Sequence, residues 1–313
     1  MLCPIHGCRR SASLAPGTFT GGAVVFNITR DCPQCSRACR TPNSCASCGG
    51  GAAGCATPDS SSCGARLWAP EIHYVPEKAA AVPRSGGYFI TYHMHCTGGG
   101  SGVLKSTSGT PIGPFAPLVG GIPGGDTSLF RDPADGKVHV ISSGSCLNAA
   151  ELSADMTRIV RSKCLSPECG GTDCSKTAIG FEGPFMYYHN ATRTYFLSSS
   201  AFGNATQHGG PSSVYNSANP PPGSHYSSYM GSAKALAGPY TDGRGNDGSW
   251  LAVDSGGHNN YFVSKEGALF ATLWYGSDPG RNTPATDADL VDTPSMVECE
   301  VASGRVVAKY PSA

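Results

Sequence analysis

The segment Glu182–Tyr187, EGPFMY, opens a pattern that recurs along the chain and decides the fold. Its polar first residue leads into a short apolar strand, a turn follows near Asn190, and an aromatic-rich second strand covers residues 194–198. A third strand of small residues covers 228–232, and the unit closes on Gly-Pro-Tyr at 238–240. Short strands separated by turns in this way predict a unit of three or four antiparallel strands.

Three further segments open in the same way, at Glu71, Asp126 and His258. Together with Glu182 these openers lie 55, 56 and 76 residues apart, a period that is typical of propeller blades. An acidic residue precedes glycine at 135–136 and 266–267, where glycine accepts the positive φ of a hairpin turn. The sequence therefore predicts an all-β fold, a five-bladed β-propeller whose inner strands bring the four openers to one mouth of the central channel.

We expect a single propeller domain over residues 1–313. Residues 24–29 predict an outer strand of the first blade, which is incomplete at the N-terminus because residues 1–30 hold no acidic opener. A Cys-rich insertion at 31–64 then separates the first and second blades. Its Cys-x-x-Cys pairs at 32/35 and 45/48 have zinc-ligand spacing, but the odd cysteine count favours a disulfide-stapled loop.

Composition excludes several classes of function. Charged residues make up 14% of the chain and the net charge is zero, so we expect no nucleic-acid partner. No apolar run is long enough for a membrane span. The 15 cysteines and the sequons at Asn27, Asn190 and Asn204 predict a secreted, disulfide-bonded glycoprotein, which we expect to be a monomer. No signal peptide is visible, which predicts a truncated start.

Four segments in order resemble the marker segments of glycoside hydrolase family 43: Trp68–His73, Asp126–Asp132, Glu182–Pro184 and Gly257–His258. The resemblance covers about residues 65–280. It implies a five-bladed propeller of the clan of arabinanases, arabinofuranosidases and β-xylosidases. It also implies inverting hydrolysis of glycans that contain arabinose, xylose or galactose, with three carboxylates in the site.

By this resemblance Glu182 is the general acid, and Asp126 orients the acid and raises its pKa. His258 is similar to the axial histidine that lies beside a calcium or sodium ion, often through water. Glu71 is a cleft-lining or structural residue. The family's general-base aspartate, expected in the first blade, has no match in this sequence.

Aromatic side chains near the openers are candidates for stacking on sugar rings, although each is also a candidate core residue. The stacking candidates are Trp68, Tyr88, Tyr226 and Trp274. With Glu71 and His258, the two tryptophans form the predicted substrate-binding set.

Other groups of residues suggest other kinds of site. His93 and His95 fall on one strand face, which suits either a metal pair or an ordinary polar face. The glycine-rich segment at 98–102 lacks the Lys-Ser/Thr of a phosphate-binding loop, and no Gly-x-Ser-x-Gly elbow occurs. Two alternatives to an enzyme stay open: a propeller that binds glycan or protein without a working base, and a zinc-dependent interaction module built on the Cys-rich insertion.

Overall fold

The computed structural model describes residues 8–10, 20–23, 66–76, 86–95, 101–144, 146–165, 182–203, 214–215, 225–241, 251–253, 257–275, 293–302 and 304–309. Every regular element within these ranges is a β-strand, as the all-β prediction requires. None of the described residues forms a helix with the length and hydropathy of a membrane span.

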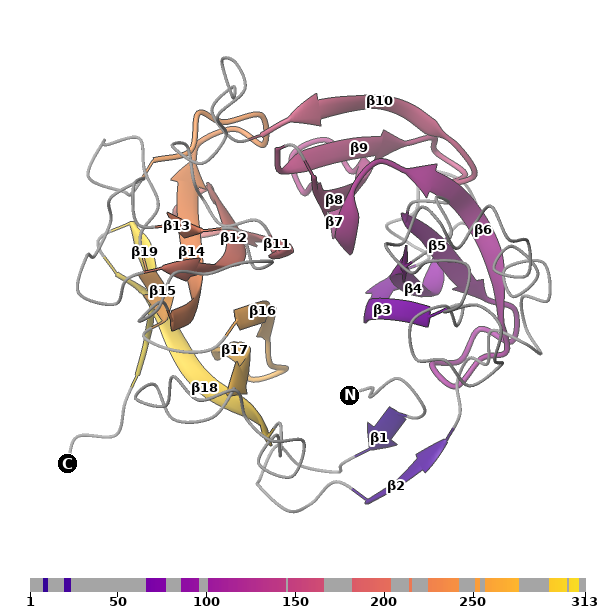
Figure 1. Ribbon diagram of the computed structural model, residues 1–313, viewed down its shortest axis with the longest axis horizontal. Coiled ribbons are helices and arrows are strands. Elements are labelled where there is room, and N and C mark those ends of the chain that lie inside the picture. The colour runs from indigo at the N-terminus through magenta and orange to yellow at the C-terminus, as the bar shows by residue number, and fades with distance from the viewer. Residues whose placement is uncertain are drawn as a thin grey trace, which may run out of the picture. The chain divides into compact units, whose positions relative to one another are not determined.

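Most strands belong to four sheets, and in each sheet the main strands follow one another in chain order (Figure 1). The first sheet contains β3 (Arg66–Val75), β4 (Gly87–His95), β5 (Ser101–Ser106) and β6 (Phe115–Ile122). The second contains β7 (Gly125–Arg131), β8 (Val138–Ser143), β9 (Asn148–Leu152) and β10 (Ile159–Cys164).

The third sheet contains β11 (Glu182–His189), β12 (Thr194–Gly203), β14 (His225–Ala233) and β15 (Leu251–Val253), with β13 (Val214–Tyr215) paired to β12. The fourth contains β16 (Gly257–Val263), β17 (Leu269–Tyr275), β18 (Thr293–Ala302) and β19 (Arg305–Ala308). A separate two-stranded sheet pairs β1 (Cys8–Arg10) with β2 (Thr20–Ala23).

Four consecutive strands in one sheet are the construction of a propeller blade, so the described residues contain four blades. The predicted strand at 24–29 and the Cys-rich insertion at 31–64 lie outside the described residues, and the fifth blade stays a prediction. The chain divides into two compact units, which we call unit 1 (residues 1–140 and 150–161) and unit 2 (residues 141–149 and 162–313). The single domain over 1–313 also stays a prediction.

Each unit has its own hydrophobic core. In unit 1, fully buried Phe89, Val103 and Val140 pack with other apolar side chains of the first and second sheets. In unit 2, Phe196, Met230 and Ala271 form a corresponding cluster between the third and fourth sheets. The inner strands of each unit therefore belong to sheets that pack on a common core, which makes their ends a rigid base for a site.

The two predicted acidic-glycine turns are present. Gly136 in the β7–β8 turn has φ of 77° and Gly267 in the β16–β17 turn has φ of 89°. At the first turn, the Asp132 N–H donates to the Lys137 carbonyl over 2.8 Å. Glycine is required at both positions because other residues strain at such φ values.

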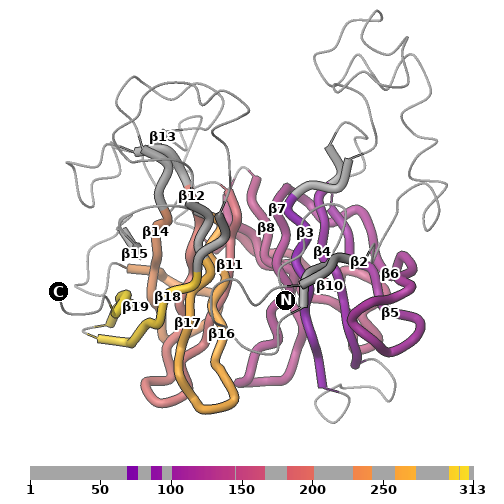
Figure 2. Tube along the Cα trace, turned by 90° about the horizontal axis from the view of Figure 1, so that it is seen from below, coloured from indigo at the N-terminus to yellow at the C-terminus, as the bar shows by residue number. Residues whose placement is uncertain are grey.

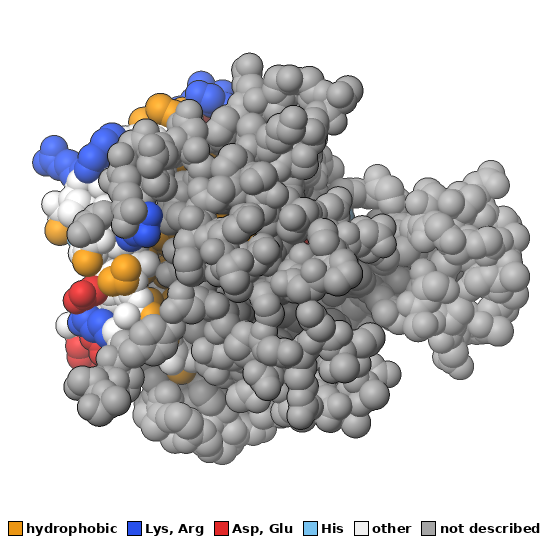
Figure 3. Space-filling model, turned by 60° about the vertical axis from the view of Figure 1, so that its left-hand side comes forward, with side chains coloured by type: hydrophobic (Ala, Val, Ile, Leu, Met, Phe, Trp, Pro, Cys, Tyr) orange, Lys and Arg blue, Asp and Glu red, His pale blue; other side chains and the backbone are white. Residues whose placement is uncertain are grey.

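A disulfide joins Cys146, just before β9, to Cys164 at the end of β10. In the sequence Cys164 groups with Cys169 and Cys174, both of which lie outside the described residues, and spacing alone leaves the pairing open. The described surface in Figure 3 mixes basic, acidic and hydrophobic side chains.

Candidate active site

The first strand of three sheets carries a β-bulge at its start. Pairing shifts between Trp68 and Glu71 on β3, between Glu182 and Phe185 on β11, and between Gly257 and Asn260 on β16. At each bulge two residues of the first strand oppose a single residue of the second strand. Bulges bend a strand and redirect its side chains, and they are frequent next to active sites.

One residue of each bulge adopts a left-handed backbone, and β7 has the same feature. These residues are Ala69 (φ 43°), Asp126 (φ 41°), Gly183 (φ 50°) and His258 (φ 52°). Ala69 and Asp126 are 57 residues apart, as are Asp126 and Gly183, and 75 residues separate Gly183 from His258. A left-handed non-glycine residue costs about 1–2 kcal/mol, and such strain clusters at functional sites.

This register corrects the alignment of the four predicted openers. Asp126 and His258 share the left-handed position, whereas Glu182 precedes it by one residue and Glu71 follows it by two. The openers therefore lie at the same end of four equivalent strands but at three different positions along them. Sequence spacing alone could not resolve this, because the bulge changes the side-chain alternation.

In unit 2, Ser200 lies beside the backbones of both Glu182 and His258. Glu182 pairs with Ser200 across β11 and β12, and the His258 N–H donates to the Ser200 hydroxyl over 2.7 Å. Ser200 is fully buried, while Glu182 and His258 are half-buried. A half-buried carboxylate at a rigid strand end can exchange a proton with a ligand.

Gly183 permits this close approach of β11 and β16. A Cβ atom placed on Gly183 would lie 2.5 Å from Cδ2 and 2.6 Å from Cγ of His258, and 2.9 Å from its Cα. Such distances are incompatible with any side chain, so the imidazole packs directly on the Gly183 backbone. The glycine that follows Glu182 is thus required both by its φ and by the histidine that it supports.

Buried polar atoms lie behind this strand end. The side chains of Ser199, Ser228, Asn259 and Tyr261 have no hydrogen-bond partner among the described residues. Burial raises the pKa of the Tyr261 hydroxyl, and the polar side chains of Asn259 and Ser228 around it oppose the shift. The base of this end of unit 2 is therefore polar rather than hydrophobic.

In unit 1, Asp126 is held by a reciprocal pair of threonine bonds. The Thr91 hydroxyl on β4 donates to the Thr127 carbonyl over 2.6 Å, and the Thr127 hydroxyl donates to the Tyr92 carbonyl over 3.2 Å. Both threonine side chains are buried. Because these bonds fix the residue next to Asp126 to the neighbouring sheet, the backbone that carries the carboxylate is held by rigid elements.

Glu71 has a partner of its own on β3. Its carboxylate lies 3.0 Å from Nε2 of His73, a nitrogen that can either donate to Glu71 or accept the Leu129 N–H of β7, which lies 3.2 Å away. His73 therefore either holds the Glu71 carboxylate on β3 or links β3 to β7. This contact favours the structural role of Glu71 over a direct role in chemistry.

The predicted histidine pair is only partly described. His93 Nδ1 lies 3.2 Å from the Ser101 hydroxyl, and the ring stands against Gly125, the residue before Asp126. The side chain of His95 lies outside the described residues. His93 is therefore placed as a neighbour of the Asp126 strand end.

Of the predicted aromatic residues, Trp68 pairs with His93 and Trp274 pairs with Gly257, which puts both backbones at the opener end of their sheets. Their side chains, and that of Tyr226, lie outside the described residues. Tyr88 lies at the opposite end of β4, where its ring contacts Tyr74 at a centroid distance of 4.8 Å. Its predicted place near the openers is therefore wrong.

A cavity of about 440 Å³ in unit 2 lies away from these residues. It is lined by the turns of the β11–β12 and β16–β17 hairpins, which lie at the same end of the unit (Figure 2), and by residues of β18 such as Glu298 and Glu300. Glu182 and His258 lie at the other ends of β11 and β16. The cavity is therefore separate from the candidate active site.

Comparison with known proteins gives a consistent picture. The family model described as Glycosyl hydrolases family 43 matches residues 53–288, which include every predicted site residue. No curated protein matches the chain.

Solved structures share the fold. An exo-1,5-α-L-arabinanase from a bovine ruminal metagenomic library has 15% identity and a TM-score of 0.58, over 94% of this chain and 86% of that one. An α-L-arabinanase from Cellvibrio cellulosa has 16% identity and a TM-score of 0.52, over 78% of this chain and 77% of that one. At these identities the likeness establishes the fold alone.

Proposed function

Because the chain belongs to glycosyl hydrolase family 43, we propose that it cleaves glycans containing arabinose, xylose or galactose by an inverting single displacement. The observation that carries this proposal is the placement of Glu182 beside His258 on a bulged strand, with buried Ser200 beside the backbones of both. A half-buried carboxyl group carried by a rigid, bulged strand suits the role of a general acid.

Glu182 would donate a proton to the glycosidic oxygen as the bond to the anomeric carbon breaks. An ionised carboxylate on the opposite face of the sugar activates the attacking water, and in inverting enzymes the two groups stand about 6.5–9.5 Å apart to admit it. We assign Asp126 the orienting role, since its strand end is fixed by the Thr91–Thr127 bonds. The general base has no assigned residue in this sequence.

Substrate binding would fall to residues at the same strand ends. We assign Trp68 and Trp274 to stacking on sugar faces, because their backbones pair with His93 and Gly257 at the opener end. The arabinanase names of the two solved relatives favour an arabinose-containing glycan. We assign Glu71 to holding the cleft through His73 rather than to the reaction.

His258 would lie beside a calcium or sodium ion. Such cations prefer oxygen ligands, whereas the imidazole offers nitrogen. His258 would therefore contact the ion through water, with its ring packed on Gly183 and its backbone N–H bonded to the Ser200 hydroxyl. Bound there, the ion would supply positive charge near the sugar.

We further propose that the protein is a secreted monomeric glycoprotein. The Cys146–Cys164 disulfide fits an oxidising compartment. Asn190 of one sequon is exposed in the β11–β12 turn, where a glycan could be attached.

The test is the cleavage of aryl α-L-arabinofuranosides, aryl β-D-xylosides and arabinan by the 313-residue chain, with and without added azide. Azide attacks the anomeric carbon without needing a base, so it replaces activated water when the base is missing. Sugar released without azide, with inverted configuration by NMR, supports the complete mechanism. A glycosyl azide formed only with added azide supports the acid and shows that the base is absent.

A second function, glycan or protein binding without catalysis, is favoured by the unmatched base position. It is supported if arabinan binds in calorimetry while neither water nor azide gives a product. Neither binding nor product with any of these sugars would overturn both proposals.

A further inference from the structure

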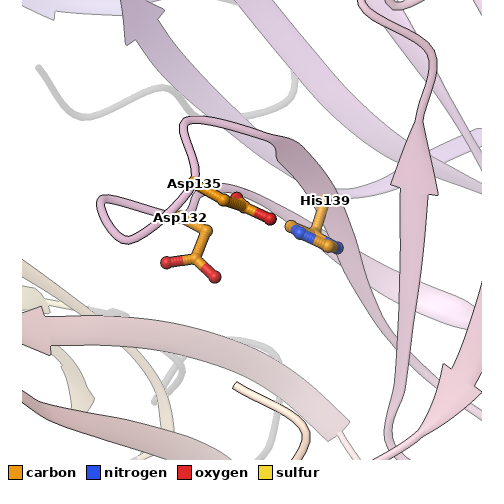
Figure 4. Close-up of side chains that lie close together, drawn as sticks. All are labelled: Asp132, Asp135 and His139. Carbon is orange, nitrogen blue, oxygen red and sulfur yellow. The ribbon is translucent and has the colours of Figure 1, made fainter. Parts of the chain in front are cut away.

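Three metal-ligating side chains meet at the β7–β8 hairpin of unit 1, away from the candidate active site. They are Asp132 and Asp135 in the turn and His139 on β8, with one ligand atom of each within 4.8 Å of the others. Figure 4 shows the carboxylate of Asp135 directed toward the imidazole ring of His139. Asp126 lies at the opposite end of β7, so this cluster is separate from the proposed reaction.

His139 is the feature that a simple turn does not explain. Its side chain is only 6% exposed, and neither ring nitrogen has a hydrogen-bond partner among the described residues. Burying an imidazole without partners is costly, and nearly all buried polar groups in proteins are satisfied. A ligand that accepts a nitrogen lone pair would satisfy it.

The two carboxylates are positioned in advance by the turn. One oxygen of Asp132 accepts the Ala134 N–H, and one oxygen of Asp135 accepts the Lys137 N–H, both over 2.9 Å. Asp132 is 6% exposed, whereas Asp135 is exposed and gives access from solvent. Backbone bonds of this kind orient metal-ligating carboxylates.

We propose that Asp132, Asp135 and His139 bind a divalent first-row transition-metal ion such as Mn²⁺. Two carboxylates and one imidazole suit such an ion, since carboxylates favour manganese and imidazole favours the later metals of the row. Bonds of about 2.0–2.2 Å place ligand atoms about 3.0–3.5 Å apart, so no separation within the cluster has to shorten by more than about 1.8 Å on binding. Water completes the coordination.

Lys137 is the group that competes with the ion. Its ammonium lies 3.6 Å from Oδ2 of Asp135 and 3.2 Å from Oε1 of Glu151. Arg161 holds the other Glu151 oxygen over 2.7 Å. Because Glu151 can retain the ammonium, Asp135 can turn from Lys137 to the metal. Removing the lysine charge should therefore tighten binding.

The test is a titration of the full chain with Mn²⁺. The protein is first treated with chelator and dialysed, and electron paramagnetic resonance then measures the concentration of free Mn²⁺. Mn²⁺ is chosen because the thiolates of the Cys-rich segment favour zinc. The variants are Asp135→Asn, His139→Gln and Lys137→Gln. Asp155→Asn is the matched control, since Asp155 is also a turn carboxylate that accepts a backbone N–H but stands outside the cluster.

We expect the wild type and Asp155→Asn to bind one more Mn²⁺ than Asp135→Asn does, or to bind that ion at least about ten-fold more tightly. Even the loss of a group that only hydrogen-bonds to a metal ligand lowers metal affinity about 10–100-fold. Lys137→Gln should bind more tightly than wild type. Asp135→Asn keeps the test decisive if His139→Gln fails to fold. Equal Mn²⁺ binding by wild type and Asp135→Asn, or none by wild type, would overturn the proposal.

Discussion

Replacing Gly183 by alanine should lower the free energy of unfolding by about 1–5 kcal/mol and displace His258. The left-handed φ of 50° costs an alanine about 1–2 kcal/mol. The added Cβ would meet the His258 ring at 2.5 Å, and overpacking of this kind costs about 1–3 kcal/mol. Alanine also lowers the backbone entropy of the unfolded chain, which stabilises the folded variant by about 0.4–1 kcal/mol and offsets part of this loss.

Gly121 provides a matched control for the backbone contribution. It also lies in a β-bulge, on β6, with φ of 69°, but nothing lies within 4 Å of its added Cβ. Gly121→Ala should therefore show the strain without the clash. Urea denaturation of both variants, followed by tryptophan fluorescence, separates the two contributions.

A double variant locates the clash. His258→Ala should restore part of the stability lost in Gly183→Ala, because the clashes with the ring at 2.5 and 2.6 Å disappear while the clash with the backbone of residue 258 at 2.9 Å remains. The two substitutions should thus be non-additive by about 0.5–3 kcal/mol. Equal losses in Gly183→Ala and Gly121→Ala, with additive behaviour of the pair, would refute the packing of His258 on Gly183.

Two further predictions concern the second sheet. Hydrogen bonds from Ser153 and Thr157 lower the pKa of Asp155 to about 2. Because folding lowers this pKa, the stabilisation is present above the ordinary range near pH 4 and is lost as pH falls toward about 2. In thermal unfolding curves Asp155→Asn should therefore be less stable than wild type near neutral pH, and the difference should shrink as pH falls through about 2. A difference that does not change with pH would contradict this. The Cys146–Cys164 disulfide closes a separation of 18 residues, so its double serine variant should lose about 3 kcal/mol in oxidising buffer, and no loss would contradict a native bond.

The hairpins were predictable because their chemistry is local. Apolar and aromatic alternation indicated β11, β12, β16 and β17, and the acidic-glycine pairs indicated two of the turns. The strand β9, with the sequence NAAEL, was missed because alanine, glutamate and leucine carry no preference for strands. Its place in the sheet follows from its neighbours.

The candidate site was predictable in its residues but not in its register. The order of the segments identified Glu182 and His258. Ser200 lies beside the backbones of both residues because of a bulge, and no residue pattern predicts that bulge. The metal-ligating cluster was missed for a similar reason. Asp132 and Asp135 look like ordinary turn residues until the buried, unpartnered His139 is placed beside them.

The most direct test of Glu182 as the general acid is the rate at which Glu182→Gln cleaves arabinan, with azide added if the wild type requires it. The control is Glu298→Gln. Glu298 is an exposed residue of β18, and its carboxylate forms an ion pair with the Lys309 ammonium at 2.9 Å. General acid catalysis raises the rate about 10²–10⁴-fold. A leaving group that departs without a proton does not need the general acid.

Glu182→Gln should therefore lose at least about 10²-fold on arabinan. It should lose much less on a dinitrophenyl arabinofuranoside, and its free energy of unfolding should stay within about 1 kcal/mol of wild type because the replacement is isosteric. Glu298→Gln should cleave both substrates at the wild-type rate. Cleavage of arabinan by Glu182→Gln at the wild-type rate would contradict the assignment.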